Sequence, residues 1–327
     1  MRLRIQVVLV VIWSCMLVGC GSAVQPTSDV RSIVVGMPFI PNVQFAHFYV
    51  AEQEGYFADE GLSVTFDYNF ENDVVQRIAT NNQITFALAS ADSILLARSK
   101  GLPVRAVMAT TQAFPIGFIS KSDTGITAID DLRGKTIGIP GRFGASYIGL
   151  QAILRAGNLT EDDVRIQEIG FTQVAALRED NVDVVSGYIN NEPIQLRNAG
   201  VNVNVLAVSE LYPLASDHLI VSEQTLSTDR ILVEKFTRAL LRGMNRVNED
   251  PDAAFTVALS AIPEANRVDP MLGVAILKET VRLWQPENFG VIQEPNWANT
   301  QRLLIDMKLI SADVSLTDAY DTSFVSR

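Results

Sequence analysis

Short apolar segments of strand type alternate with segments of helical periodicity along most of this chain. The alternation begins with a strand near 32–37 and a helix over 43–53, and it restarts after residue 129. Strands separated by helices predict a mostly parallel α/β sheet with helices on both faces, because parallel neighbours need a crossover connection. A chain of 327 residues also exceeds the size at which one hydrophobic core usually stops growing. We therefore expect two α/β lobes.

The interruptions of the alternation indicate how the chain is divided. We expect a discontinuous first lobe, residues 32–118 and 219–327, and a second lobe, residues 119–218, inserted into it. Apolar segments at 116–120 and 217–221 are predicted to be the strands that cross between the lobes. The rest of the C-terminal part has helical periodicity.

A glycine-rich segment, residues 135–150, is predicted to be a strand, a turn and a helix start. Free backbone N–H groups and the positive end of the dipole suit a helix start to ligand binding, and glycines allow close approach. The glycines at 138, 141, 144 and 149 do not form G-x-G-x-x-G, and a phosphate-binding loop would need a glycine in place of Ile129. We therefore expect a ligand-holding corner of the second lobe that is not a nucleotide site.

The N-terminus has the pattern of an export signal. A basic start precedes an apolar run that ends in Leu17-Val18-Gly19-Cys20, which resembles the bacterial lipobox. We expect residues 1–19 to be removed as a signal peptide, Cys20 to be lipidated, and residues 20–31 to form a tether. The alternative is an ordinary signal peptide or an N-terminal anchor helix. Export and anchoring to the cell membrane, in the periplasm or on the outer face, would follow.

Charge and cysteine content exclude several classes of function. The chain has 26 Lys and Arg against 37 Asp and Glu, and loss of Arg2 and Arg4 with the signal would change the net charge from −11 to −13. An acidic surface argues against nucleic acid and leaves lipid as the only membrane contact. Cys15 and Cys20 are the only cysteines, so the mature chain has no pair for a disulfide or a thiolate metal site. Two histidines do not make a metal site.

Motifs in both predicted lobes resemble one family of substrate-binding proteins of ABC importers. They are Pro41-Asn42-Val43-Gln44-Phe45, Glu54-Gly55-Tyr56-Phe57 and Asp131-Leu132-Arg133-Gly134-Lys135. The family is related to thiamine-pyrimidine synthesis proteins and to nitrate, sulfonate and taurine binders. The resemblance covers essentially the whole mature chain. It implies a two-lobed Venus-flytrap fold (periplasmic-binding-protein type II) that passes solute to an ABC permease and its ATPase.

Longer matches within that family narrow the implied ligand. The Pro-Asn-Val-Gln-Phe motif, together with Gly144-Ala145-Ser146-Tyr147 and Asn190-Asn191-Glu192-Pro193, is most similar to binders that take up riboflavin. Binders of thiamine pyrimidine precursors are the alternative, followed by sulfonate or nitrate binders.

Candidate ligand contacts are the residues that follow each strand, because ligands of open α/β sheets bind beyond the carboxyl ends of the strands. The first lobe is expected to contribute Asn42, Gln44, Phe45, Tyr68, Asn69, Glu71, Ser90, Asp92, Gln112, Phe114 and Pro115, and the second lobe Gly144, Ala145, Ser146, Tyr147, Tyr188, Asn191 and Glu192.

Five aromatic rings among amides and carboxylates suit a flat heterocycle, whose faces stack and whose edge exchanges hydrogen bonds. Arg142 is the only guanidinium nearby, whereas a sulfonate or nitrate site would need more cationic groups. Each ring could instead pack in a core, and each carboxylate could stabilise a helix start.

Two other classes of function fit part of the pattern. Relatives that synthesise the thiamine pyrimidine are enzymes with a cysteine-rich iron site and a histidine in the segment after Pro-Asn. Here Val43-Gln44-Phe45 follows Pro-Asn, and His47 lies two positions later. A sensing module would need a separate receptor as its partner. We therefore expect a monomeric, non-catalytic binder without a cofactor, whose lobes close on the ligand.

Overall fold

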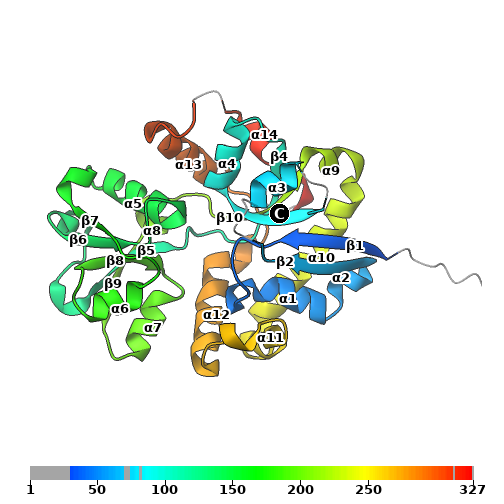
Figure 1. Ribbon diagram of the computed structural model, residues 1–327. Helices are drawn as coiled ribbons and strands as arrows, with labels where there is room; N and C mark the ends of the chain where they lie inside the picture. Colours follow the sequence, from blue (N-terminus) through cyan, green and yellow to red (C-terminus); the bar gives the residue numbers. More distant parts are fainter. Residues whose placement is uncertain (1–29, 70–73, 81–82, 312–313, 326–327) are drawn as a thin grey trace, which may run out of the picture.

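The computed structural model describes residues 30–69, 74–80, 83–311 and 314–325, which form two five-stranded sheets covered by helices (Figure 1). The two α/β lobes predicted from the alternation are confirmed. The predicted signal peptide and all but the end of the predicted tether lie outside the described residues. Among the described residues, no helix is both long and apolar enough to cross a membrane.

The first sheet has the strand order β2-β1-β3-β10-β4. Its strands are β1 (Arg31–Gly36), β2 (Leu62–Asp67), β3 (Phe86–Ser90), β4 (Val104–Ala109) and β10 (Asp217–Ser222). The strand β10 is antiparallel to both of its neighbours, whereas β1 is parallel to β2 and β3. Strand β3 reads as a continuous apolar run because helices cover both faces of the sheet.

Two groups of helices enclose the first sheet (Figure 1). One face is covered by α3 (Val74–Thr80), α4 (Ala91–Ser99), α13 (Glu294–Asp306) and α14 (Leu316–Ala319). The other is covered by α1 (Ala46–Gln53), α2 (Tyr56–Asp59), α10 (Arg230–Glu249) and α11 (Pro251–Leu259), with α9 (Glu223–Thr228) at the end of the sheet and α12 (Pro270–Trp284) beside the second lobe. Asp229, Asp250 and Asp269 cap α10, α11 and α12, their side chains accepting bonds from backbone N–H groups.

The second sheet has the order β7-β6-β8-β5-β9. Its strands are β5 (Ile116–Lys121), β6 (Thr136–Ile139), β7 (Arg165–Glu168), β8 (Val184–Tyr188) and β9 (Val203–Ala207). Strands β6, β7 and β8 run parallel, and β5 is antiparallel to β8 and β9. Helices α5 (Gly144–Ala156) and α8 (Val208–Leu211) cover one face, and α6 (Gln173–Arg178) and α7 (Glu192–Asn198) cover the other (Figure 1).

The prediction that two strands cross between the lobes is wrong. Strand β5 lies wholly in the second sheet and β10 wholly in the first, so the predicted boundary at 118/119 falls inside β5, and that at 218/219 falls inside β10. The connections are instead the segment 110–115 and the chain from α8 to Ser216. The sheet to which each strand belongs is set by hydrogen bonds to strands distant in sequence, and local periodicity cannot predict these pairings.

Both connections join the same edges of the two sheets. The first runs from the end of β4 to Ile116, which pairs with Tyr188 at the carboxyl end of β8. The second leads from β9 to Asp217, which pairs with Ser90 at the carboxyl end of β3. The carboxyl edges of the parallel strands in both lobes therefore face each other, as Figure 1 shows.

The two lobes share part of their core. One cluster of buried side chains continues from the first lobe through Phe114, Leu214 and Ala215 into α5 of the second lobe. Within the first lobe, Phe236 of α10 stacks on Phe86 of β3, with ring centroids 4.0 Å apart. Apolar packing near the connections thus supports a defined arrangement of the two lobes.

Candidate functional site

Three large aromatic side chains stand exposed at the carboxyl edge of the second sheet. Phe143 follows β6, Phe171 follows β7, and Tyr188 ends β8, and these are three adjacent parallel strands. Their exposed fractions are 60%, 74% and 37%. Exposed rings grouped on one edge indicate a surface that binds an apolar, flat partner. We call Phe143, Phe171 and Tyr188 the aromatic edge.

Glycines shape the turn that carries Phe143. Gly144 has a φ of +62°, a conformation that favours glycine, and it directly follows Phe143 at the start of α5. The Phe143 ring lies over Gly141, where an added Cβ would stand 2.3 Å from the ring. The glycine-rich segment 135–150 therefore presents an aromatic ring at its turn.

Three carboxylates lie where the two edges meet. Asp92 is in the first turn of α4, Asp217 begins β10 opposite Ser90, and Glu192 begins α7. Asp92 is 4% exposed, and its Oδ1 atom has no hydrogen-bond partner among the described residues. Glu192 Oε2 accepts a bond of 2.7 Å from the backbone N–H of Tyr188. We call Asp92, Asp217 and Glu192 the acidic cluster.

Burial and mutual charge raise the pKa values within the acidic cluster and the pKa of Tyr188. Burial raises the pKa of Asp92 and of Glu192. Burial and, next, the negative charge of Asp92 raise the pKa of Asp217 to about 6. Desolvation and then the charges of Asp217, Glu192 and Asp92 raise the pKa of Tyr188. The three carboxylates and the phenol therefore form one electrostatic group that spans both lobes.

A cavity of about 150 Å³ opens between the lobes beside this group. Its walls come from the turn after β1, from α7 and from the α11–α12 region, and its lining residues are Asn42, Val43, Gln44, Asn191, Gln195, Phe255, Leu259, Ile262, Asn266, Arg267, Val268 and Ile276. Many of these side chains are amides, which can both donate and accept hydrogen bonds. We call this space the interlobe cavity.

Local hydrogen bonds hold the amides of the interlobe cavity in place. The side chain of Asn42 accepts a bond of 2.9 Å from the N–H of Gln44 and donates one of 2.9 Å to the carbonyl of Ile40. Gln195 Nε2 donates to Asn191 Oδ1 over 2.8 Å. The cavity wall is therefore organised by its own side chains before any ligand arrives.

Several residues predicted from sequence do come together here. Asn42, Gln44 and Asn191 line the interlobe cavity, Asp92 and Glu192 belong to the acidic cluster, and Tyr188 belongs to the aromatic edge. Gly144 and partly buried Ala145 lie next to Phe143 at the start of α5. Phe45 and Ser90 are partly buried, Phe45 packing against the first-lobe core and Ser90 donating to Ser93 Oγ.

Other predicted contacts are structural, and the structure corrects them. Phe114 is 1% exposed within the core shared by the lobes, where its ring packs beside Gly149. Gln112 donates two bonds from Nε2, to the carbonyls of Asn288 and Val291, and so anchors the first connection. The carbonyl of buried Pro115 accepts from Ile189 N–H. These side chains are used to build the connection between the lobes.

The remaining predictions lie on local networks or outside the described residues. Tyr68 donates to Tyr49 Oη over 3.0 Å, and exposed Asn69 binds Asp67 through its N–H. Tyr147 donates to Glu161 over 3.0 Å, beside buried Ser146. Glu71 lies outside the described residues.

Sequence reasoning missed Phe143, Phe171 and Asp217. Phe143 stands four residues beyond β6 and Phe171 three residues beyond β7, each beside a glycine. Asp217 was assigned to a crossing strand, so its position at a carboxyl edge was not recognised.

Arg142, the candidate cation of this region, is neutralised. It forms an ion pair with Glu161 and lies 3.8 Å from Glu168 through Nε. Its guanidinium also lies over the Tyr147 ring, 5.9 Å from the centroid. The charge of Arg142 is therefore balanced within the second lobe.

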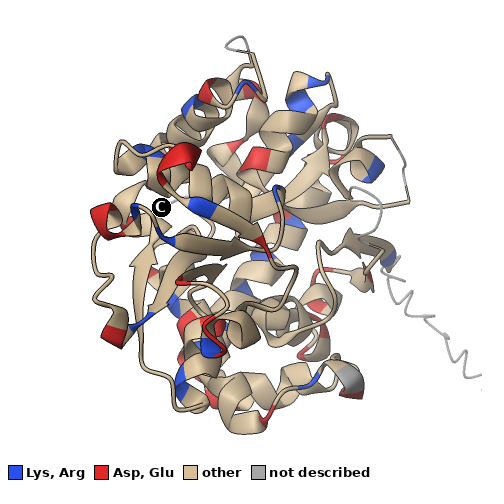
Figure 2. Cartoon of the chain, turned by 60° about the vertical axis from the view of Figure 1, so that its left-hand side comes forward, with Lys and Arg blue, Asp and Glu red and all other residues tan. Residues whose placement is uncertain are grey.

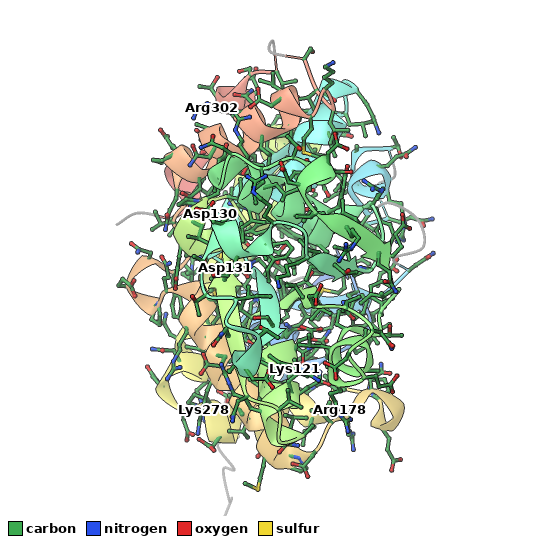
Figure 3. All side chains as sticks on the ribbon, turned by 90° about the vertical axis from the view of Figure 1, so that its left-hand side faces the viewer. Lys121, Asp130, Asp131, Arg178, Lys278 and Arg302 are labelled. Atoms are coloured by element: carbon green, nitrogen blue, oxygen red, sulfur yellow. The ribbon has the colours of Figure 1, made fainter. Side chains whose placement is uncertain are left out.

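Exposed charges elsewhere on the second lobe lie away from the facing edges. Figure 3 shows Lys121, Asp130, Asp131 and Arg178 on the side of the second lobe turned away from the first. Lys121 is the last residue of β5, at the end of the strand far from the segment 110–115, and it pairs with Asp180. Asp131 accepts hydrogen bonds from two backbone N–H groups at a turn. Acidic and basic positions are interspersed over the outer helices in the view of Figure 2.

The two histidines are structural. His218 Nδ1 donates to the carbonyl of Ser216, and its Nε2 accepts from Trp297 Nε1 over 3.1 Å. Burial lowers the pKa of His218 to about 4 and that of His47 to about 3. Both imidazoles are therefore neutral at pH 7, and the described residues contain no group of three or more side chains able to hold a metal ion.

A larger cavity, of about 630 Å³, lies within the first lobe along β4. It is lined by Val107 together with the segment from Asn288 to Pro295, Thr322 and Val325. It holds none of the aromatic edge or the acidic cluster.

Comparisons with known proteins show the family of this chain. The family described as NMT1/THI5-like matches residues 42–254. The riboflavin-binding protein RibY of Chloroflexus aurantiacus is 46% identical over 308 residues, 92% of this chain and 87% of RibY. The formylaminopyrimidine-binding protein of Halalkalibacterium halodurans is 28% identical over 242 residues, 72% of each chain.

A solved structure shows the same fold. The periplasmic aliphatic sulphonate binding protein SsuA of Escherichia coli superimposes with a TM-score of 0.72 over 91% of this chain and 94% of SsuA, at 10% sequence identity. The family match covers more than half of the sequence, and the RibY identity extends over nearly all of it. The chain therefore belongs to the NMT1/THI5-like family and has the two-lobed fold of periplasmic solute-binding proteins.

Proposed function

We propose that this protein is the solute-binding lipoprotein of an ABC importer and that it captures a flat aromatic vitamin, riboflavin, between its lobes. The observation that carries the ligand class is the aromatic edge, three exposed rings on adjacent strands that face the other lobe. The 46% identity to a riboflavin-binding protein supports the choice of ligand.

The geometry suggests how such a ligand is held. An isoalloxazine ring would stack on the aromatic edge, and its polar edge would meet the amides of the interlobe cavity. The hydroxylated side chain of riboflavin would donate hydrogen bonds to the acidic cluster. Rotation about the segment 110–115 and the chain from α8 to Ser216 would then bring the lobes together.

Delivery completes the proposed role. The lipobox-like sequence at Cys20 supports export and lipid anchoring, which would keep the protein beside a permease and its ATPase. The ligand is bound and released unchanged, a role supported by the RibY relative and by the solute-binding structural neighbours.

A thiamine pyrimidine precursor is the second candidate, because a formylaminopyrimidine-binding protein is also related over 72% of the chain. A single pyrimidine ring would cover less of the aromatic edge than a three-ring flavin. A sulfonate is disfavoured, since Arg142 is already paired with Glu161.

A ligand panel tests the proposal. The mature chain from residue 20, with Cys20→Ser to remove lipidation, would be titrated with riboflavin, the formylated aminopyrimidine, thiamine and taurine. Isothermal calorimetry and flavin fluorescence should show one saturable riboflavin site with quenched emission. Tight binding of the pyrimidine alone would move the assignment to the second candidate, and binding of taurine alone would refute an aromatic ligand.

A further inference from the structure

We propose that the ligand site selects by charge and that the acidic cluster admits riboflavin while rejecting its 5′-phosphate ester. The inference rests on the proposed function and deepens it, because it names which form of the vitamin is transported. It assigns Asp92, Asp217 and Glu192 the role of specificity-determining residues.

The carboxylates come from both lobes and converge beside the aromatic edge. Asp92 and Asp217 stand at the carboxyl edge of the first sheet, where Ala91 N–H donates to the carbonyl of Ser216 over 3.0 Å and so ties α4 to β10. Glu192 approaches from the second lobe and holds the backbone of Tyr188. A ligand ring that stacks on Tyr188 therefore lies close to all three carboxyl groups.

An acceptor atom of the acidic cluster without a partner calls for a hydrogen-bond donor on the ligand. Asp92 is 4% exposed, and its Oδ1 atom has no partner among the described residues. Buried acceptors without partners are costly, so a bound ligand is expected to satisfy them. The hydroxyl groups of the ribityl chain are donors of this kind, whereas a phosphate dianion at the end of that chain offers acceptors only.

Asp92 also occupies a place where anions usually bind. A helix start attracts an anion through free N–H groups and the helix dipole. Asp92 lies in the first turn of α4, so the start of this helix already carries a carboxyl group. A phosphate would have to displace or approach that carboxyl group.

The cations near the site have other partners. Arg142 pairs with Glu161, and Arg77 pairs with Asp67 over 2.5 Å. Arg267, in the wall of the interlobe cavity, donates from Nε and Nη2 to the carbonyls of Ile262 and Leu259 at the end of α11. The negative end of the α11 dipole offsets part of that charge. None of these three guanidiniums pairs with the acidic cluster.

Simple electrostatics sets the expected size of the effect. At an effective dielectric constant of about 20, two like unit charges about 6 Å apart repel enough to weaken binding about 100-fold. A phosphate carries more than one negative charge at pH 7. The phosphate ester is therefore expected to bind at least about 100-fold more weakly than riboflavin.

The test compares flavins that differ in charge and in size. The mature chain with Cys20→Ser would be titrated with riboflavin, its 5′-phosphate, its neutral 5′-acetate ester and lumiflavin, which has no ribityl chain. The same ligands would be tested on Asp92→Asn/Asp217→Asn and on Asp130→Asn, a matched control on the outer face of the second lobe (Figure 3). Circular dichroism and thermal unfolding would establish that each variant is folded.

The proposal predicts that riboflavin, lumiflavin and the neutral ester bind, and that the phosphate binds at least 100-fold more weakly. The double variant should reduce this ratio at least tenfold, and the control should leave it unchanged. Phosphate binding within threefold of riboflavin, equal rejection of the neutral ester, or an unchanged ratio in the folded double variant would overturn charge selection. Failure to bind any flavin would refute the proposed function itself, and charge selection with it.

Discussion

Replacing Phe171 with alanine should weaken ligand binding and leave the fold almost unchanged. The side chain is 74% exposed, so only about a quarter of its surface is buried by folding. Full burial of a phenylalanine is worth about 3–5 kcal/mol, so the loss of unfolding free energy should stay below about 1 kcal/mol. Stacking of an aromatic ring on a heterocycle is worth about 1–3 kcal/mol, which corresponds to about a 5- to 150-fold loss of affinity.

The matched control is Phe114→Ala. Phe114 is 1% exposed in the core shared by the lobes, so its truncation should cost about 3–5 kcal/mol of unfolding free energy. Urea unfolding measures the stability of both variants, and titration with riboflavin measures their affinities. Wild-type affinity in Phe171→Ala, or a stability loss above about 2 kcal/mol, would refute the assignment of Phe171 to the binding surface.

Three further predictions concern stability. Asp217 has a folded pKa of about 6, above its unfolded value, so the stability that its protonated form contributes is lost as pH rises through 6. In urea titrations, the unfolding free energy of Asp217→Asn should rise above that of the wild type by up to about 3 kcal/mol between pH 4 and 7. A difference that does not change with pH would contradict this. His218 has a folded pKa of about 4, below its unfolded value, so the stability that its neutral ring contributes is lost as pH falls below 6.5. His218→Gln should therefore remove up to about 3 kcal/mol of the destabilisation by acid, and parallel pH profiles of stability for the variant and the wild type would contradict this. Gly243→Ala places a Cβ 2.4 Å from the carbonyl of His47, and calorimetry should show a loss of about 1–3 kcal/mol; an unchanged melting temperature would argue against the close contact of α1 and α10.

Much of the fold was predictable because it is encoded locally. The β4 segment 104–109 and the helix over 173–178 are recognisable from their own periodicity and from the polar residues that bound them. Strand β5 is equally clear as a strand, but its place in the second sheet depends on pairing with β8 and β9. Local pattern therefore located the strand and misplaced the lobe boundary.

The site shows the same limit at the level of side chains. Phe114 and Phe171 both follow strands or connections in a glycine- or proline-containing turn, and sequence alone does not say which ring the tertiary packing will bury. Asp92 was predictable because it stands directly after β3 at a helix start. Asp217 was not, because its role depends on β10 running antiparallel to β3, so that the beginning of one strand meets the end of the other.

The central claim is that riboflavin is held between the lobes. With Cys20→Ser the mature chain has no cysteine, so spin labels can be placed at Asp130→Cys in the second lobe and Ser227→Cys in the first. Both positions are exposed. Double electron–electron resonance should show that saturating riboflavin shortens the mean distance between the labels and narrows its distribution. A distribution that stays unchanged when riboflavin is bound would contradict the account.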